Sequence, residues 1–242
     1  MLTALCCSGV LFFHSYYYDP VYISGSSMNP TLVGANENAV YDEHPDSESL
    51  KADFGIVDSH QSALKHIKRF DIVSTYFPIE KDYNADGTVK KDAERKIKRI
   101  IALPNETFKI KDGLLYVLKG ESFELIPYTF NTLPDASIGY TGKDVKEKTL
   151  GANEYWVLGD NREYSHDSAS VGPIYYNNIC GVLVAIEGRG DLYIKSLVCD
   201  TCHSTFKYTE DSEDSCPKKG CDGTLIKKLD IKNKRYSWPK YF

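Results

Sequence analysis

A serine-rich turn near the start of the chain could present a nucleophilic hydroxyl. The segment from Ser24 to Leu32 contains three serines, a glycine that permits a sharp bend, and Pro30, which fixes φ and removes a backbone donor. A chain bent in this way can direct a hydroxyl group and its own amide into a cleft. Serine-rich turns are also common on protein surfaces, so this segment by itself does not identify a nucleophile.

A strand-like segment from Lys96 to Pro104 could supply a base. Alternation along a strand places Lys98 and Ile100 on one face and Arg99 and Ile101 on the other, so each face carries a cation among apolar side chains. Loss of water disfavours the charged amine, and a lysine acts as a base near neutrality only when its pKa falls from about 10.4 to about 7 to 8. The alternative is a strand whose lysines reach back to solvent.

A third polar segment, from Gly159 to Ser168, follows the apolar run at residues 155–158. Polar residues packed this densely after a strand can hydrogen-bond to one another and to nearby backbone, which builds a rigid loop. Such a loop could hold a hydroxyl group against a lysine amine. A solvated turn is the alternative interpretation.

Four of the seven cysteines are spaced like the ligands of a small metal site. Two residues separate Cys199 from Cys202, and four residues separate Cys216 from Cys221. Two such pairs around a hairpin resemble a zinc ribbon, in which four thiolates bind Zn²⁺ and hold together a unit too small for its own core. The second spacing is longer than the usual two residues, so two disulfides or free thiols remain alternatives.

The segments that must position these residues are mainly β-strands. Apolar and β-branched runs predict strands at residues 21–23, 70–77, 97–103, 107–110, 114–118, 155–158, 179–186 and 192–198. Residues 33–68 are polar and irregular, and the Pro-Asp-Ser-Glu-Ser stretch at 45–49 is interpreted as a surface loop. Residues 81–96 are interpreted as a hairpin loop. We therefore expect a mainly β domain from residue 19 to residue 196.

Together the motifs resemble type I signal peptidases, the Ser-Lys peptidases of family S26, in a Gram-positive-like form. The matching segments follow the family's order: Ser-Met-Asn-Pro-Thr at 27–31, Arg-Phe-Asp-Ile-Val at 69–73, Lys-Arg-Ile-Ile-Ala-Leu-Pro at 98–104, and Gly-Asp-Asn-Arg-Glu-Tyr-Ser-His-Asp-Ser at 159–168. The resemblance covers roughly residues 20 to 186. It implies an antiparallel β catalytic domain, followed here by a small zinc-ribbon-like unit.

The resemblance also implies a Ser-Lys dyad that works without a cofactor. Ser27 would be the nucleophile, Lys98 in its neutral form the general base, and the Ser27 amide part of the oxyanion hole. Some relatives add a serine side chain to that hole two residues before the nucleophile, where this chain has Gly25. A side-chain donor is therefore absent at that position.

Three further residues match supporting positions of the family. Ser165 corresponds to the serine that orients the lysine amine, and Asp167 to an aspartate expected to pair with Arg99. The chain departs from the family where Ala169 replaces an arginine and where Asn105-Glu106 replaces Gly-Asp. Because asparagine tolerates a left-handed backbone better than most residues, we expect the turn at Asn105 to form.

Residues 1–18 contain no charged side chain other than, when protonated, His14, and residues 2–13 are almost wholly apolar. We expect residues 1–18 to be the outer end of a membrane helix whose beginning lies outside this chain; a buried N-terminal strand or helix is the alternative. The predicted organisation is thus an anchor at 1–18, a catalytic domain at 19–196 and a zinc-ribbon-like appendage at 197–242. An isolated structural Zn²⁺ in the appendage is the expected metal.

The resemblance implies that the substrates are preproteins, whose signal peptides end in small residues at −1 and −3. It places the enzyme at the cell membrane, in contact with lipid, with the catalytic domain on the extracytoplasmic side. Lys and Arg number 29 against 34 Asp and Glu, and this net charge of −5 excludes non-specific nucleic-acid binding.

Two other functions share part of this pattern. An inactive relative could serve as a membrane-attached zinc-ribbon interaction module, although both dyad residues are present. A self-cleaving repressor-type protease would use the same dyad, but it would lack the Gly-Asp-Asn-Arg loop and would carry a DNA-binding helical segment.

Overall fold

The computed structural model describes most of the chain between residues 17 and 241. The described residues are 17–36, 38–39, 48–77, 95–127, 144–209 and 212–241, with side chains up to residue 237. All but the last two residues of the predicted anchor lie outside them, as does nearly all of the predicted hairpin loop at 81–96. Among the described residues, no helix has the length and apolar character that a membrane crossing requires.

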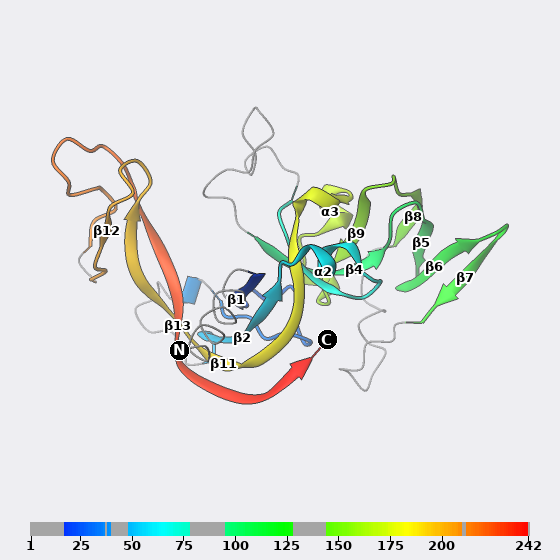
Figure 1. Cartoon of the computed structure of the whole chain (residues 1–242), viewed down its shortest axis with the longest axis horizontal. Coiled ribbons are helices and arrows are strands. Elements are labelled where there is room, and N and C mark those ends of the chain that lie inside the picture. The colour runs from blue at the N-terminus through cyan, green and yellow to red at the C-terminus, as the bar shows by residue number, and fades with distance from the viewer. Residues whose placement is uncertain are drawn as a thin grey trace, which may run out of the picture.

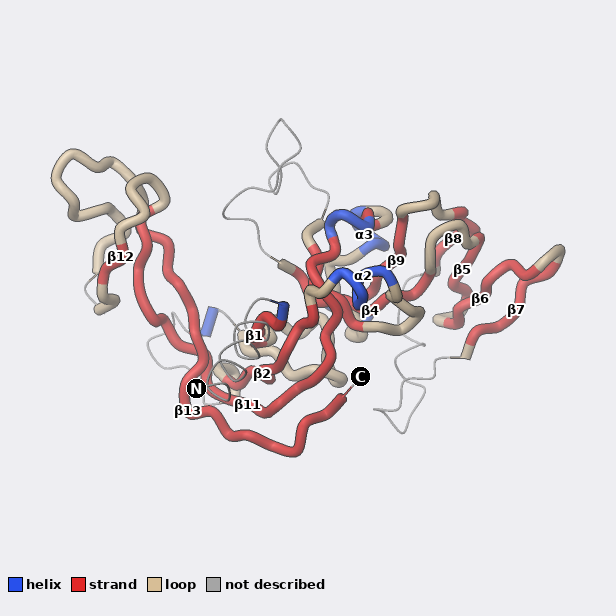
Figure 2. Tube along the Cα trace, viewed as in Figure 1, coloured by secondary structure: helices blue, strands red, loops and turns tan. Residues whose placement is uncertain are grey.

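A large antiparallel sheet forms the centre of the molecule (Figures 1 and 2). Its strands are β1 (Tyr18–Tyr22), β2 (Lys51–Asp58), β3 (Ile72–Thr75), β4 (Lys96–Ala102), β9 (Glu154–Leu158), β10 (Ile174–Tyr175), β11 (Ile179–Cys199), β12 (Thr205–Phe206) and β13 (Leu225–Tyr241). Their order is β1-β2-β11-β3-β4-β9-β10, and both β12 and β13 pair with β11. The predicted mainly β fold is therefore confirmed.

A second sheet packs beside β4 and β9, at the end of the molecule opposite β12 (Figure 1). It consists of β5 (Thr107–Lys111), β6 (Leu114–Lys119), β7 (Ser122–Ile126) and β8 (Val145–Thr149), in the order β7-β6-β5-β8. Phe108 and Leu115 of this sheet share a buried core with Trp156 and Leu158 of β9. The helices are short: α2 (Gln61–Lys65), α3 (Ser168–Val171), η4 (Arg162–Tyr164) and η5 (Tyr176–Asn178).

The segment at residues 33–68, in which the sequence pattern predicted no regular element, contains β2 and α2. Strand β2 lies between β1 and β11, so both of its edges are hydrogen-bonded. Its side chains at Ala52, Phe54 and Val57 are buried although polar residues interrupt them in sequence. Pairing on both sides thus makes a strand of a segment whose sequence pattern is irregular.

The two runs predicted at 179–186 and 192–198 form one strand of 21 residues, β11. The polar stretch between them stays extended because β2 pairs with one edge of β11 and β13 with the other. The predicted domain division at 196/197 falls inside this strand. Beyond the core, β11 and β13 continue as a two-stranded ribbon with β12 near its tip (Figure 1).

Candidate active site

The turn that carries Ser27 is fixed by buried apolar side chains on its C-terminal side. Met28 and Leu32 are 1% and 0% exposed and pack in one core with Val57 and Ile72. On the other side, the Gly25 amide donates to the Ala35 carbonyl at 2.7 Å. Gly25 has a φ of 72°, a backbone conformation that glycine adopts without strain.

The Lys98 amine lies against the Ser27 hydroxyl, although 71 positions separate the two residues in sequence. Lys98 is in β4, where it pairs with Val73 of β3, and only 4% of it is exposed. Its Nζ donates to Ser27 Oγ at 2.8 Å and to the Ile97 carbonyl at 2.9 Å. Ser27 and Lys98, which the sequence predicts to form the dyad, are therefore in contact.

Burial lowers the pKa of Lys98 from its ordinary 10.5 to about 8, since the charged amine has lost its water. The charges of Asp167 and Asp160 oppose this effect, and that of Lys96 adds to it. Part of the amine is consequently neutral near physiological pH. In that form the same contact lets the Ser27 hydroxyl donate to Nζ, which is the geometry of a general base and its nucleophile.

The loop that begins at Gly159 is attached directly to the Ser27 turn. The Asn161 amide donates to the Ser27 carbonyl at 3.0 Å, and the Asn161 side chain donates to the Ser26 carbonyl at 3.1 Å. A Cβ on Gly159 would lie 2.4 Å from the Ser27 carbonyl oxygen and 2.2 Å from Ser165 Oγ. Only glycine permits this close approach, so the loop and the turn form one unit.

Ser165 lies in this loop, beside Gly159. Its Oγ is buried and has no hydrogen-bond partner among the described residues. Ser165 and the Lys98 amine therefore form no hydrogen bond in this structure, although the resemblance implies one. Its orienting role stays a prediction.

Arg99 binds Asp160, which corrects the predicted pairing with Asp167. Arg99 Nε and Nη2 donate to the two Asp160 oxygens at 2.8 and 2.7 Å, and the side chains are 2% and 0% exposed. Asp167 instead accepts from the Gly159 and Ala169 amides, and so caps α3.

The strand register explains this correction. Arg99 pairs with Leu158 across β4 and β9, and the residue two positions beyond Leu158 returns to the same face. That residue is Asp160, which the sequence analysis did not single out. The motif at 159–168 contained the signal, but choosing between its two aspartates, Asp160 and Asp167, required the register.

The motif at 69–73 supports the end of β4. Arg69 donates to the Ile101 carbonyl at 2.6 Å and to Glu106 Oε1 at 2.5 Å, and the Leu103 amide donates to the other Glu106 oxygen at 2.7 Å. Asn105 has a φ of 64°, so the expectation of a left-handed residue in this turn is confirmed. Glu106 supplies a carboxylate where the family commonly has aspartate.

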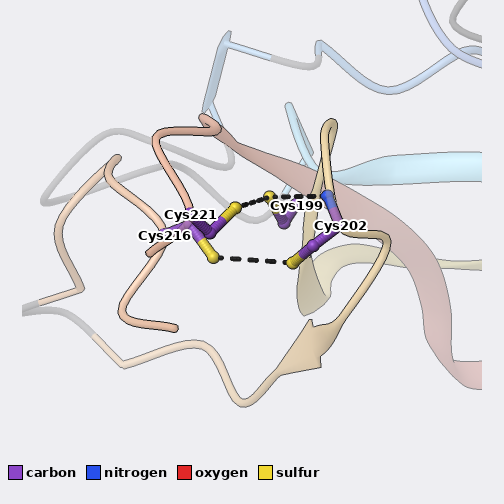
Figure 3. A group of neighbouring side chains, drawn as sticks. All are labelled: Cys199, Cys202, Cys216 and Cys221. Carbon is purple, nitrogen blue, oxygen red and sulfur yellow. Dashed lines mark hydrogen bonds between the residues drawn. The ribbon is translucent and has the colours of Figure 1, made fainter. Parts of the chain in front are cut away.

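The four clustered cysteines lie far from the dyad in sequence, at the tip of the β11–β13 ribbon (Figure 3). Their sulfur atoms all lie within 4.8 Å of one another, so the group could hold a metal ion. His203, whose imidazole is also a possible metal ligand, is exposed and does not belong to this group.

Comparison with known proteins identifies the family. Residues 1–186 match the family "Signal peptidase, peptidase S26". Signal peptidase I V of Bacillus subtilis is 34% identical over 172 residues, which cover 68% of this chain and 83% of that protein. Signal peptidase I of Bacillus caldolyticus is 31% identical over 163 residues, covering 66% of this chain and 73% of that protein.

A crystal structure of a signal peptidase I from Enterococcus faecalis V583 is 25% identical, with a TM-score of 0.34 over 48% of this chain and 96% of the other. The assignment therefore rests on the sequence matches, which span the Ser27 turn, β4 and the Gly159 loop. The chain belongs to the signal peptidase family, peptidase S26.

Proposed function

We propose that Ser27 and Lys98 are the catalytic dyad of this signal peptidase, with Ser27 as nucleophile and Lys98 as general base. The observation that carries the proposal is the 2.8 Å contact between a buried lysine amine and a serine hydroxyl. Burial of an ammonium group is costly, and at this site the cost produces a base that works near neutral pH.

The reaction that this geometry supports is acyl transfer in two steps. Neutral Lys98 takes the Ser27 proton as Oγ attacks the scissile carbonyl, and then gives that proton to the departing amine. This leaves the N-terminal part of the substrate esterified to Ser27. Lys98, neutral again, next deprotonates a water molecule that hydrolyses the ester and restores the hydroxyl.

The developing oxyanion requires a donor close to the nucleophile. The Ser27 amide has no acceptor among the described residues, so it is free to donate to the substrate. Gly25 contributes no side chain at the position where some relatives carry a second donor. We therefore assign the backbone amide of Ser27 to the oxyanion hole.

The supporting residues act through position. The Arg99–Asp160 pair holds the loop that carries Gly159 and Asn161, and this loop binds the Ser27 turn. Asp167 caps α3 and binds the Gly159 amide. The buried hydroxyl of Ser165 beside Gly159 supports a role in orienting the Lys98 amine when substrate enters.

The substrates that we propose are secreted preproteins, cut after small residues at −1 and −3. Residues 1–18 would anchor the enzyme in the cell membrane, in contact with lipid and with the catalytic domain on the extracytoplasmic side, where translocated preproteins emerge. The dyad chemistry itself uses no cofactor. The metal that we propose is a structural zinc ion at the cysteine cluster.

A cleavage assay tests the dyad. A preprotein with an Ala-x-Ala site is incubated in detergent with the parent chain, Ser27→Ala and Lys98→Ala, and the product is mapped by mass spectrometry. We expect cleavage after the second alanine by the parent, and rates lower by at least about 10³-fold in both variants. Ser24→Ala and Lys119→Ala, at exposed positions, are matched controls that should cleave normally.

The outcomes also distinguish the other functions. Retained cleavage by Lys98→Ala contradicts the assignment of the base, and retained cleavage by Ser27→Ala contradicts that of the nucleophile. A folded parent chain that cuts no preprotein supports an inactive interaction module instead. Cleavage of the chain itself, without cleavage of added preprotein, supports a self-cleaving protease.

A further inference from the structure

We propose that Cys199, Cys202, Cys216 and Cys221 bind one zinc ion as a closed tetrathiolate centre that fastens the tip of the β11–β13 ribbon. The family match ends at residue 186, so this site lies in a part of the chain that the family does not account for. The proposal does not depend on the peptidase activity. It rests on sulfur geometry, on the local backbone and on the smallness of the surrounding core.

The sulfur separations fit a tetrahedral ion. Cys199 Sγ lies 3.6 Å from Cys221 Sγ, and Cys202 Sγ lies 3.7 Å from Cys216 Sγ (Figure 3). Four thiolates around Zn²⁺ with Zn–S bonds of about 2.3 Å place neighbouring sulfur atoms about 3.8 Å apart. A disulfide would bring two sulfur atoms to about 2.05 Å, so neither pair has that geometry.

The backbone on both sides is shaped to bring the cysteines together. The Cys202 amide points at Cys199 Sγ at 3.4 Å, an arrangement that stabilises a thiolate. The Cys216 amide donates to the Gly223 carbonyl at 2.9 Å, which closes the second loop around its own pair. A Cβ on Gly223 would lie 2.5 Å from Cys199 Sγ, so the loops approach as closely as only glycine allows.

The apolar core at the tip is too small to hold these loops by itself. Its buried members are Leu197, Cys199 and Leu225, with Phe206 and Tyr208 partly buried against them. So few apolar groups do not offset the conformational entropy of ordering two loops. Bonds from a metal to four side chains supply the missing free energy, as in other small units that fold around zinc.

The role that follows is structural. Four thiolates fill the tetrahedral coordination of zinc and leave no position for water or substrate. Cys199 is the last residue of β11 and pairs with Leu225, the first residue of β13. An ion bound there joins the ends of both strands, and β11 itself continues into the sheet that contains β2 and β3.

Metal analysis of the full chain tests the site. The protein is purified in detergent with reductant and Zn²⁺, dialysed, and measured by elemental mass spectrometry. We expect one zinc ion per chain in the parent and loss of that ion in Cys202→Ser and Cys216→Ser. Cys180→Ser removes a free cysteine of β11 outside the cluster and should keep the metal.

Substitution of Co²⁺ gives a second measurement that needs no cysteine variant to fold. Tetrahedral thiolate ligation should produce intense visible bands and sulfur-to-metal charge-transfer absorption, both lost on addition of excess Zn²⁺. A mercurial thiol reagent should release one zinc ion per parent chain as the cluster reacts.

Several results would overturn the proposal. These are a zinc-free parent chain, zinc retained in both cysteine variants, iron in place of zinc, octahedral cobalt spectra, or an intact mass that reports two disulfides in protein isolated without reductant.

Discussion

The Ser27–Lys98 site and the cysteine cluster hold reactive side chains in opposite ways. At the dyad, buried apolar residues from several strands surround the turn and the lysine, and Met28 and Leu32 are almost fully enclosed. At the ribbon tip, the buried apolar cluster is limited to Leu197, Cys199 and Leu225, with a few partly buried side chains packed against it. The dyad is built by packing, whereas the tip brings together four sulfur atoms that could hold a metal ion.

The two regions therefore depend on the residues around them in different ways. The core around the dyad removes water from Lys98, and that loss lowers the pKa of the amine, so that its neutral form is available as a base near neutral pH. The described residues of the ribbon tip form a much smaller core, so under our proposal its order depends on metal ligation rather than on burial. A change in packing should therefore affect the chemistry of the first region, and removal of the metal should affect the local folding of the second.

Breaking the buried ion pair should produce the largest effect. Asp160→Asn removes the carboxylate that binds the buried Arg99 guanidinium, and we expect a loss of about 3 to 5 kcal/mol in the free energy of unfolding. Urea denaturation measures it. Asp230→Asn breaks the exposed pair with Lys195 and is the matched control, with a far smaller shift. Equal shifts would mean that Arg99 keeps its stabilisation from other groups.

The second-largest effect should come from adding a side chain at Gly159, where the loop lies against the Ser27 turn. Gly159→Ala pushes a methyl group into the Ser27 carbonyl and Ser165 Oγ, and the displaced nucleophile should lower kcat on the order of 10²-fold. Steady-state kinetics with a signal-peptide substrate measures it. Gly151→Ala, whose added Cβ would meet Glu154 at 3.4 Å, should retain its activity. An active Gly159→Ala enzyme would show that the loop and the turn are not coupled.

The dependence of kcat/KM on pH tests whether the pKa of Lys98 is lowered. Only neutral Lys98 accepts the proton, so kcat/KM should rise with pH and level off above a pKa of about 8. With a pKa of about 8, kcat/KM should increase about tenfold between pH 7 and pH 9. Lys96→Met removes a positive charge that lowers the pKa of Lys98, so the profile should move to higher pH. A flat profile between pH 6 and pH 9 would contradict Lys98 as the base.

Metal removal should have the smallest effect on cleavage. A chelator should abolish hydrogen-exchange protection at the amides around Cys199 and Leu225, while those of β4 stay protected and the cleavage rate changes by less than about twofold. Mass spectrometry of peptic fragments measures the hydrogen exchange, and the preprotein assay measures the cleavage rate. Loss of cleavage after chelation would show that the ribbon tip controls the active site.

Much of the site could be predicted because its chemistry is encoded locally. Ser27 and Lys98 lie in short motifs with a particular order, and the turn at Asn105 forms as its residue type predicts. Strand β2 could not be predicted in the same way. Its residues become a strand because β1 and β11 supply hydrogen-bond partners from distant parts of the chain.

The sequence by itself determined which groups were available: a serine in a bent turn, a lysine in an apolar strand and four cysteines with metal-ligand spacing. Only the tertiary structure decided that Lys98 loses its water against Ser27, that Arg99 binds Asp160 rather than Asp167, and that the four sulfur atoms converge. The physical reason is that desolvation, ion pairing and ligation depend on distances in space. Those distances are set by strand register and packing over the whole sheet.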